Sequence, residues 1–442
     1  MYTRRPFIKK ALMGTVALNF APALLRAGAP GSHPRNDKNQ DVIRIALIGK
    51  GKMGTSDTRT ALMTGGVELI GVCDLYDARL QDARKLWGDK ILVTKDYKDI
   101  LSMSNVDAVI VATPDHWHQQ IAIDSLKAGK HVYCEKPVIH KLEEGKALLE
   151  AQEKSNCLLQ VGSQGMASLG NRAARKLVQA GAIGRVNFVE AQFSSTPRAL
   201  SQFVPPDDAS EQTIWWSRFL GNAPKREFDP RRFFQWRSWS DYGTGLAGDL
   251  FVHVVASIQY IMNASGPEKV YATGGIRHYI DGSRDTPDFI LGYFDYPDKN
   301  NMGAFTLSVG ANCVDGVSKK WGSTDFRIVG DKGTLEVGWD KIVLKTLNTT
   351  DENSFGLLKE LGQGIEIPQK ISSNEFIFQT DKTYKGGHYD HFSHFFEGIR
   401  NGAPISADAL FAVRSAAPAL LCNLSYLKQK PVFWDAEKLI YK

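Results

Sequence analysis

The sequence predicts an α/β protein in two parts: a doubly wound parallel sheet over residues 41–162, then an α+β domain over 163–442 with a mostly antiparallel sheet. Two observations predict it. Up to Gly162, continuous apolar runs alternate with helix-like stretches, which is typical of parallel strands buried on both faces. Beyond Gly162, strand-like runs follow one another with short turns between them, which indicates antiparallel pairing. A chain of 442 residues is long enough for two such domains.

The first part is expected to contain six strands separated by five helices. The strands are the apolar runs at 42–48, 67–73, 91–93, 107–113, 131–134 and 158–161, and the helix-like segments lie at 52–64, 77–87, 96–103, 116–129 and 140–155. In such a sheet the carboxyl ends of the strands share one edge, where open α/β sheets bind ligands.

In the second part, from residue 163 on, helices and strands no longer alternate regularly. A helix at 171–180 and a strand at 185–194 precede an irregular stretch rich in proline and aromatic residues at 197–242, and a long helix follows at 245–262. Further strands are expected at 269–276, 288–295, 303–309, 324–330 and 334–346, and helices at 389–400 and 406–428. Turns such as Gly330-Asp331-Lys332-Gly333 join successive strands, so these strands are expected to pair antiparallel.

Residues 1–36 are predicted to be a signal peptide and its linker. Arg4 and Arg5 precede an apolar run at 11–25, which is too short to span a bilayer comfortably. The arginine pair and the Pro-Phe-Ile-Lys-Lys that follows resemble a twin-arginine signal, the route that carries folded proteins. This predicts a periplasmic protein without a stable membrane anchor. A disordered basic tail and an uncleaved anchor are the alternatives.

Charge and cysteine content argue against a nucleic-acid-binding protein and against a disulfide-stabilised one. Residues 1–40 hold seven basic residues and one acidic residue, so they account for the whole net charge of +6. The remainder is formally neutral, which removes the electrostatic case for a nucleic-acid partner. The five cysteines show no CxxC spacing and do not form a disulfide framework. Free thiols agree with a protein that folds in the reducing cytoplasm before export.

A glycine-rich turn follows the first predicted strand. Gly49, Gly51 and Gly54 have the G-x-G-x-x-G spacing of a dinucleotide-binding turn, with Lys52 and Met53 between the second and third glycines. The first glycine permits the tight turn, the second lets the backbone approach a pyrophosphate, and the third allows close packing of helix on strand. The helix that begins here would offer amide hydrogens to the phosphates.

The cofactor preference is predicted by Asp74, twenty residues after Gly54 at the end of the second predicted strand. A carboxylate at this place accepts hydrogen bonds from the adenosine ribose and repels a 2′-phosphate. The pattern therefore favours NAD over NADP, although Arg79 is close enough in sequence to approach the adenosine. A plain turn aspartate is the alternative.

Three residues are candidates for catalysis. Lys136 stands at the carboxyl end of the fifth predicted strand, where an α/β sheet binds its ligands. Asp249 and His253 are four residues apart, so they share one face of a helix that is otherwise apolar. A buried histidine satisfied by a helical aspartate is the alternative. A nucleotide-binding fold and a strand-end lysine in the same chain favour the catalytic interpretation.

In this setting the chain resembles the glucose–fructose oxidoreductase / inositol dehydrogenase / rhizopine-catabolism (Gfo/Idh/MocA) family. The matching motifs are the glycine turn 49–54, ATPDHWH (112–118), EKP (135–137), VGSQ (161–164), DLFVH (249–253), WRSWSDYGTG (236–245) and GGHYDHFSHFFEGIR (386–400). The resemblance runs from about residue 41 to the C-terminus. It implies a Rossmann domain followed by an α+β domain with a large open sheet, and NAD(P)-dependent oxidation or reduction of sugar and polyol hydroxyls.

The resemblance also implies roles. Lys136 would contact the substrate hydroxyl and the nicotinamide ribose, Asp249 would orient the substrate, and His253 would accept the proton. A histidine suits that task because its pKa lies near neutrality, and an ammonium group stabilises a developing alkoxide. The positions that match the family's cofactor lining are Thr113, Pro114, His118, Glu135, Lys136 and Gln164. Asp115 replaces the family's usual asparagine.

Two groups of side chains are open to two interpretations each. Trp236, Arg237, Trp239 and Tyr242 could form a wall that stacks on a sugar ring and binds substrate, or pack between the domains. His388, His391 and His394 could hold a metal, but their spacing spreads them around a helix and no acidic partner is evident, so no metal site is predicted. His391 matches a family position and is expected to line the cleft.

Three functions are compatible with these residues. The first is an exported NAD-dependent sugar or polyol oxidoreductase that carries its cofactor through export and encloses it with residues 30–40 and 197–242. The second is a glycosidase that uses bound NAD to form a transient keto-sugar. The third is a non-catalytic sugar-binding accessory protein, against which the intact Lys136 and His253 argue. The open sheet is expected to form a homodimer or homotetramer.

Overall fold

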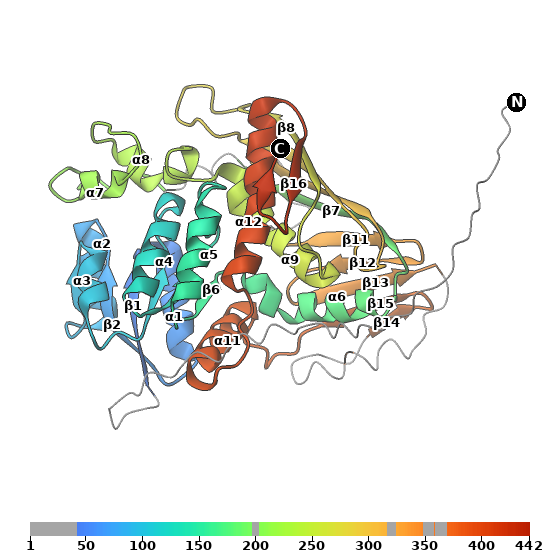
Figure 1. Ribbon diagram of the computed structural model, residues 1–442, viewed down its shortest axis with the longest axis horizontal. Helices are drawn as coiled ribbons and strands as arrows, with labels where there is room; N and C mark the ends of the chain where they lie inside the picture. Colours follow the sequence, from blue (N-terminus) through green and yellow to red (C-terminus); the bar gives the residue numbers. More distant parts are fainter. Residues whose placement is uncertain (1–41, 197–202, 316–323, 348–357, 359–368) are drawn as a thin grey trace, which may run out of the picture. The chain divides into compact units, whose positions relative to one another are not determined.

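Six parallel strands form the first sheet of the computed structural model, which describes residues 42–196, 203–315, 324–347, 358 and 369–442 (Figure 1). The strands are β1 (Ile43–Ile48), β2 (Val67–Cys73), β3 (Leu92–Thr94), β4 (Ala108–Val111), β5 (His131–Cys134) and β6 (Leu159–Val161), in the order β3-β2-β1-β4-β5-β6. This order confirms the predicted doubly wound sheet. The predicted signal segment 1–36 lies outside the described residues.

Helices cover both faces of this sheet, because β1 presents alternate apolar side chains to each. Those that follow the strands are α1 (Lys52–Met63), α2 (Asp77–Trp87), α3 (Tyr97–Ser102), α4 (His118–Lys127) and α5 (Glu144–Lys154), with a short 3₁₀ turn η1 (Asp115–Trp117). Ile45 and Leu47 share a core with α1 and α2, whereas Ala46 and Ile48 share one with α3, α4 and α5. Burial on both faces explains the continuous apolar runs.

The second sheet confirms the prediction of a large, mostly antiparallel sheet. Within the described residues it contains β7 (Val186–Ser194), β8 (Lys269–Gly275), β9 (Phe289–Tyr296), β10 (Phe305–Asn312), β11 (Phe326–Gly330), β12 (Gly333–Val337), β13 (Lys341–Thr346), β14 (Gln369–Ser372), β15 (Glu375–Gln379), β16 (Val432–Asp435) and β17 (Ile440–Tyr441). Their order is β14-β15-β13-β12-β11-β7-β10-β9-β8-β16-β17. Only β7 and β10 pair parallel here, with Val189 opposite Leu307.

The remaining helices of the described residues are η2 (Gln164–Ala167), α6 (Leu169–Gln179), α7 (Trp216–Leu220), α8 (Pro230–Phe234), η4 (Trp236–Ser238), η5 (Ala247–Phe251), α9 (Val252–Met262), α11 (Gly387–Asn401) and α12 (Ala409–Lys428). One difference from the prediction is that the run 334–346 belongs to two strands, because a hairpin reverses the chain at Gly338. A second difference is that the helix expected from residue 245 starts as the π-helical turn η5.

Two C-terminal helices return to the parallel sheet. Phe392, Phe395 and Phe396 of α11 are buried beside β1, and Tyr133 of β5 stacks on Phe392 with ring centroids 4.1 Å apart. Helix α12 packs its first half against the parallel sheet's core and its second half against the core of the large sheet (Figure 1). Among the described residues α12 alone is long and apolar enough to cross a membrane, and its burial between these two cores accounts for that composition.

Candidate active site

A pocket of about 590 Å³ opens at the carboxyl ends of the parallel strands. Its floor is formed by the residues that follow β1, β2, β4 and β5, which includes the point where the strand order reverses between β1 and β4. Ligands of doubly wound sheets bind at this reversal. Its other walls come from residues 203–242, called the strap below, and from α9, α11 and the β12–β13 hairpin. The predicted residues in the lining are Gly49, Gly51, Lys52, Met53, Asp74, Thr113, Pro114, His118, Glu135, Lys136, Gln164, Trp236, Arg237 and His253.

The glycine turn has the geometry that a pyrophosphate requires. Gly49 has φ +99°, and a Cβ there would lie 2.6 Å from the carbonyl of Ala112. A Cβ on Gly54 would lie 2.1 Å from the carbonyl oxygen of Gly49, so this glycine lets α1 pack closely on β1. Gly51 lines the pocket, and a Cβ on it would meet nothing within 4 Å. No side chain caps α1, so its first amides are available to a phosphate.

These glycines predict opposite effects for two alanine variants. Gly51→Ala should leave the free energy of unfolding nearly unchanged but weaken NAD binding at least about tenfold, because its methyl group enters the pocket where the pyrophosphate approaches. Gly54→Ala should destabilise the fold by about 1–3 kcal/mol, because its methyl group overlaps the backbone of Gly49. Denaturant unfolding and titration with NAD separate the two effects. A Gly51→Ala protein that binds NAD as the parent does would contradict the assignment.

Asp74 lies buried at the end of β2, in the lining of the pocket. Its carboxylate accepts hydrogen bonds from the backbone amides of Lys50, at 2.8 Å, and Tyr76, at 3.1 Å, and it pairs with Arg79 at 3.4 Å. The backbone bonds fix the carboxylate at the edge of the pocket. Arg79 also lies there, as expected, and its guanidinium group stacks over the rings of Phe233 and Phe234 at 5.5 Å.

The strap encloses this end of the pocket. Its apolar side chains, with Tyr76 of the β2–α2 corner, form a separate buried cluster of Tyr76, Ile214, Trp216, Phe219, Leu220, Phe233, Trp239 and Tyr242. The backbone amide of Asp77 donates to the carbonyl of Thr213, and that of Trp215 donates to the carbonyl of Leu75. In Figure 1, α7 and α8 of the strap appear above α2, and Arg79 of α2 contacts Phe233 and Phe234 of α8. Residues 197–202 lie outside the described residues.

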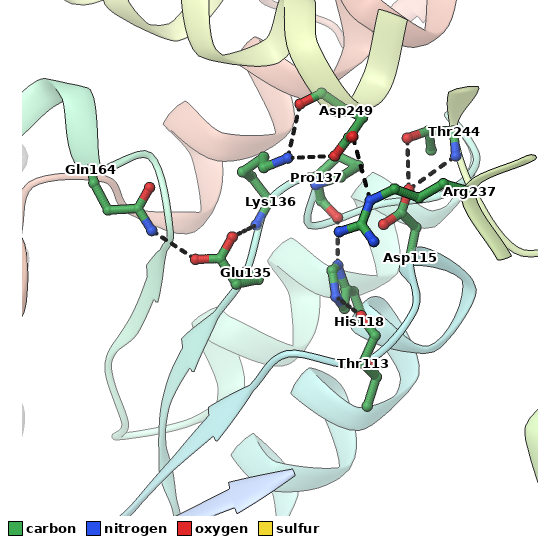
Figure 2. A network of polar contacts seen from close by, with 10 residues as sticks. All are labelled: Thr113, Asp115, His118, Glu135, Lys136, Pro137, Gln164, Arg237, Thr244 and Asp249. Carbon is green, nitrogen blue, oxygen red and sulfur yellow. Dashed lines mark hydrogen bonds and ion pairs between the residues drawn. The ribbon is translucent and has the colours of Figure 1, made fainter. Parts of the chain in front are cut away.

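Lys136 lines the pocket and pairs with Asp249, which lies outside the lining (Figure 2). The ammonium group of Lys136 donates to the Asp249 carboxylate and to its backbone carbonyl, each at 2.8 Å. Arg237 of η4 pairs with the second carboxylate oxygen at 3.4 Å. Burial by itself raises the pKa of Asp249, but Lys136 and Arg237 outweigh it and hold that pKa well below its usual range. Asp249 is therefore an anion that fixes two cations at the mouth of the site.

The π-helical turn η5 carries Asp249 and is tied to the nucleotide domain. The carboxylate of Asp115 in η1 accepts hydrogen bonds from the amide of Thr244, at 2.9 Å, and from its hydroxyl, at 2.7 Å. Thr244 stands immediately before the helix that contains η5 and α9. Asp115 thus anchors the helix that carries Asp249 and His253 (Figure 2). A π-helical turn at such a place is a frequent feature of functional sites.

His253, in the first turn of α9, lines the same pocket as Lys136. Its ring has no hydrogen-bond partner among the described residues. Burial, with Lys136 nearby, lowers the pKa of His253 to about 3, so the imidazole is neutral at physiological pH. A neutral imidazole that faces a pocket and has no internal partner has a ring nitrogen free to accept a hydrogen bond from a bound ligand. The lowered pKa differs from the near-neutral value expected of a proton acceptor, because burial disfavours the charged ring.

Glu135 and His118 line the floor of the pocket and hold neighbouring segments of it in place. The Glu135 carboxylate accepts hydrogen bonds from the Gln164 amide, at 2.7 Å, and from the backbone amide of Lys136, at 3.3 Å. Burial raises the pKa of Glu135 to about 7. The ring nitrogens of His118 lie 2.8 Å from the carbonyls of Pro137 and Thr113, so His118 ties the segments after β4 and β5 together (Figure 2).

Only some of the aromatic residues predicted to bind substrate line the pocket. Trp236 lines the pocket, and the Arg237 guanidinium stacks over it at 4.2 Å. Tyr242 lies outside the lining: it is fully buried and packs on Phe219 with ring centroids 4.8 Å apart. Trp239 belongs to the same buried cluster.

Among the three histidines of α11, His388 lines the pocket. His391 does not: it is buried, with Nε2 2.8 Å from the carbonyl of Val161. No group of acidic, histidine or cysteine side chains within the described ranges has the arrangement of a metal site. The sequence interpretation missed His388 and Trp339 as lining residues, as well as Phe203, Arg218, Phe233 and Phe234 of the strap. The spacing of the three histidines was visible, but only the fold shows which one faces the pocket.

Two family models match most of the chain. The Gfo/Idh/MocA model described as an oxidoreductase family with an NAD-binding Rossmann fold matches residues 43–163, and the model of that family's C-terminal alpha/beta domain matches residues 219–432. These ranges contain both ends of the pocket, including the glycine turn and His253.

Curated proteins and solved structures are similar to the chain to different extents. A Glycosyl hydrolase family 109 protein of Shewanella baltica is 28% identical and an alpha-N-acetylgalactosaminidase of Shewanella oneidensis is 27% identical, each over 240 residues, or 50% of this chain and 52% of the relative. The chain thus spans about half the length of these relatives.

Among solved structures, levoglucosan dehydrogenase in complex with NADH and levoglucosan has a TM-score of 0.65 at 18% identity and covers 88% of this chain and 98% of its own. The WlbA dehydrogenase from Bordetella pertussis with NADH and UDP-GlcNAcA has a TM-score of 0.64 at 20% identity, covering 88% and 97%. At this level of identity the likeness concerns the fold.

Proposed function

Because this chain belongs to the Gfo/Idh/MocA oxidoreductase family, whose N-terminal domain binds NAD, we propose that it transfers a hydride between NAD and a hydroxyl group of a sugar or polyol. The observation that carries the proposal is the convergence of Lys136, Asp249 and His253 beside the nucleotide pocket. Solved relatives of the same fold contain NADH together with levoglucosan, L-sorbose or UDP-GlcNAcA, which supports the substrate class.

In this reaction each of the site residues has a separate role. NAD, held by the glycine turn and Asp74, would supply the hydride acceptor. Oxidation of a carbinol also releases the hydroxyl proton, which the neutral imidazole of His253 accepts. Lys136 donates a hydrogen bond to the same oxygen and stabilises its developing negative charge. Asp249 keeps the ammonium group of Lys136 in place through its carboxylate and its carbonyl.

A substrate panel tests the proposal. Purified protein is incubated with glucose, galactose, N-acetylgalactosamine and myo-inositol, and the absorbance of reduced nicotinamide is followed with and without added NAD. Reduction of the cofactor by a sugar or polyol is the expected result. If no member of a broad panel of sugars and polyols reduces NAD, and no keto-sugar oxidises NADH, the proposed function is wrong.

The pH dependence of the reaction follows from His253. A group whose pKa is lowered keeps its basic form down to that lower pKa and loses it only as the pH falls through it. Because burial lowers the pKa of His253 to about 3, we expect kcat/KM to stay flat from neutral pH to well below 6.5, the ordinary value for histidine. Rates are measured over this range, and samples returned to neutral pH control for unfolding. A fall in kcat/KM that begins at or above pH 6.5 would contradict the lowered pKa of His253.

We also propose that the protein is exported by the twin-arginine route to the periplasm with NAD already bound. The supporting observations are the Arg4-Arg5 pair before a short apolar run and the strap that covers the nucleotide end of the pocket. Cell fractionation of the parent and of an Arg4→Lys/Arg5→Lys variant tests the route. The variant should accumulate in the cytoplasm, and a parent protein found only there would refute export.

A second candidate function is supported by the similarity to Glycosyl hydrolase family 109 proteins and to an alpha-N-acetylgalactosaminidase. In this alternative, bound NAD oxidises a glycoside only transiently, the aglycone is eliminated, and the sugar is reduced again. Aryl glycosides separate the two functions. Release of the aglycone without added NAD would support the glycosidase, whereas net reduction of NAD with no release would support the dehydrogenase.

The outer face of the large sheet is our proposed site of self-association. Tyr271 of β8 and Tyr293 of β9 lie opposite each other in register, and each is 40% exposed. A broad sheet face with exposed aromatic residues is stabilised when a second copy covers it. Light scattering is expected to give the mass of a dimer or tetramer. A monomer at micromolar protein concentration would exclude a dimer or tetramer that is stable at that concentration.

A further inference from the structure

Arg237 lines the pocket, and the proposed transfer of a hydride and a proton gives it no task. It lies in the short turn η4, and its Nε pairs with one oxygen of the Asp249 carboxylate at 3.4 Å. The other oxygen accepts a hydrogen bond from the ammonium group of Lys136 at 2.8 Å. Because a single carboxylate lies between the two cations, one monosaccharide is long enough to reach both. Arg237 is therefore a second contact point for the molecule whose hydroxyl group Lys136 binds.

The guanidinium group of Arg237 is held on two sides. It lies over the indole ring of Trp236, 4.2 Å from the ring centroid, and Asp249 holds its Nε (Figure 2). Its two terminal nitrogens have no hydrogen-bond partner among the described residues. The side chain is 44% exposed, and this exposure is toward a pocket that it lines. A guanidinium group fixed in this way keeps its terminal N–H donors in place for a ligand.

The backbone that carries Arg237 is fixed by the loop between β8 and β9. The carboxylate of Asp285 in this loop accepts hydrogen bonds from the Ser240 amide, at 2.7 Å, and from the Ser240 hydroxyl, at 3.0 Å. The amide of Asp285 donates to the carbonyl of Ser238 at 3.0 Å, and the Thr286 hydroxyl donates to the same carbonyl at 3.3 Å. The end of η4 is thus clamped from outside the pocket, so the position of Arg237 is set before a ligand arrives.

A guanidinium fork with free donors selects a planar anion. Its two terminal N–H groups match the two oxygens of a carboxylate, and charge-assisted hydrogen bonds of this kind are about twice as strong as neutral ones. A neutral hydroxyl group offers a single oxygen and no charge to pair with the cation. The free end of Arg237 therefore fits a carboxylate better than it fits any group of a neutral sugar.

We propose that the substrate is a sugar acid, whose carboxylate binds the terminal N–H groups of Arg237 while its reacting hydroxyl group lies at Lys136. The proposal rests on the proposed function, because it names the substrate class of the same site. No bond is made or broken at Arg237, which binds and orients the substrate. Asp249 contacts only Nε, so it leaves the terminal nitrogens to the ligand.

Two matched series of sugars test the proposal. Glucuronate and galacturonate are each compared with their methyl ester and with the parent hexose, which share the ring and its configuration but have no charge at the sixth carbon. Reduction of the bound NAD is followed over a range of sugar concentrations to obtain kcat/KM. For at least one series the acid is expected to exceed its ester and its hexose by at least about tenfold, the usual contribution of a hydrogen bond to a charged group.

Two arginine variants form a matched pair for this experiment. In Arg237→Gln the ratio of kcat/KM between acid and ester is expected to fall to about one, and Arg237→Lys, which keeps the charge but not the fork, should restore part of it. Arg231 of α8 is 64% exposed and does not line the pocket. In Arg231→Gln the ratio should therefore stay as in the parent.

The outcomes separate this proposal from the proposed function. Parent protein that reduces its NAD with neutral sugars or polyols, and no faster with either acid than with its ester, would overturn the sugar-acid assignment and leave the proposed function intact. A preference for the acid that persists in Arg237→Gln would overturn it as well. If neither acids nor neutral sugars and polyols reduce the cofactor, the proposed function itself fails. A preference that Arg237→Gln abolishes and Arg231→Gln retains would support the assignment.

Discussion

His253→Ala is expected to retain NAD and to lose about 10²- to 10⁴-fold in the rate of hydride transfer. In the proposed function His253 is the proton acceptor for the substrate hydroxyl, so the alanine variant would leave that proton without a base. Because the side chain has no hydrogen-bond partner among the described residues, its removal breaks no internal bond, and the glycine turn and Asp74 remain as they are. Single-turnover reduction of the cofactor, with NAD content measured on the same sample, gives both quantities.

An exposed histidine provides the control for this variant. His278 is exposed in the loop between β8 and β9 and does not line the pocket. The variant His278→Ala should show parental rates and parental NAD content. A His253→Ala protein that reduces NAD at the parental rate near neutral pH would remove His253 from the mechanism. A variant that has lost its NAD would instead place His253 in the binding of the cofactor.

The parallel half of the fold could be predicted because its signal is local. Each strand of this sheet is buried on both faces, so every strand appears in the sequence as an apolar run between two helix-like segments. The observed β2 (Val67–Cys73) and α2 (Asp77–Trp87) have the predicted bounds. The glycine turn was equally local, since its three residues lie close together at the junction of β1 and α1. Gly49 and Gly54 are required by backbone contacts, whereas Gly51 leaves open space in the pocket.

The antiparallel half could be predicted only in outline. The strands β14 to β17 were not predicted, and β14 and β17, which form the edges of the sheet, have exposed side chains and little apolar pattern. The run 334–346 looked like one strand because the hairpin between β12 and β13 contains Trp339, an apolar residue at a turn. Trp339 stands at that turn because it lines the pocket, which is a tertiary reason that no local pattern expresses.

The candidate site shows the same division between local and long-range signals. Lys136 followed a strand end, and Asp249 and His253 shared a helix, so the sequence could place each element. That Asp115 anchors Thr244 and that His388 rather than His391 faces the pocket depend on contacts between segments more than 10² residues apart. That Arg237 pairs with Asp249 depends on how the chain folds between η4 and η5. The wider π-helical turn at Asp249 was also beyond a helix pattern that assumes 3.6 residues per turn.

The strap bears on the proposed export, because an exported dehydrogenase would work where free NAD is scarce. NAD in the pocket would be covered at its adenosine end by the strap, and the strap is held to the nucleotide domain by several kinds of contact. The Arg218 guanidinium pairs with Asp96 at 2.6 Å, and the Trp117 indole donates to the carbonyl of Phe219 at 2.9 Å. We therefore expect release of the cofactor to require separation of these contacts and of the buried cluster, and so to be slow.

We accordingly expect protein purified without added cofactor to release NAD on acid extraction, at close to one equivalent per chain. Phe219→Ala should lose it. Phe219 is buried at the centre of the strap's cluster, where it stacks on Trp216 at 5.1 Å and contacts Phe233 at 5.0 Å. Truncation of such a residue costs about 3–5 kcal/mol. If that cost falls on the docking of the strap, NAD dissociates about 10²- to 4 × 10³-fold faster.

The control for Phe219→Ala is Phe433→Ala, which truncates a phenylalanine that is 54% exposed on β16 of the large sheet. It should retain NAD as the parent does. Dissociation is followed by dilution into an NAD-consuming enzyme, which traps each released molecule. Parent protein that emerges empty and works only with exchangeable NAD would refute retention, and it would also weaken export, since a dehydrogenase without its cofactor would have nothing to reduce outside the cytoplasm. Slow release that Phe219→Ala leaves unchanged would locate the barrier elsewhere than in the strap.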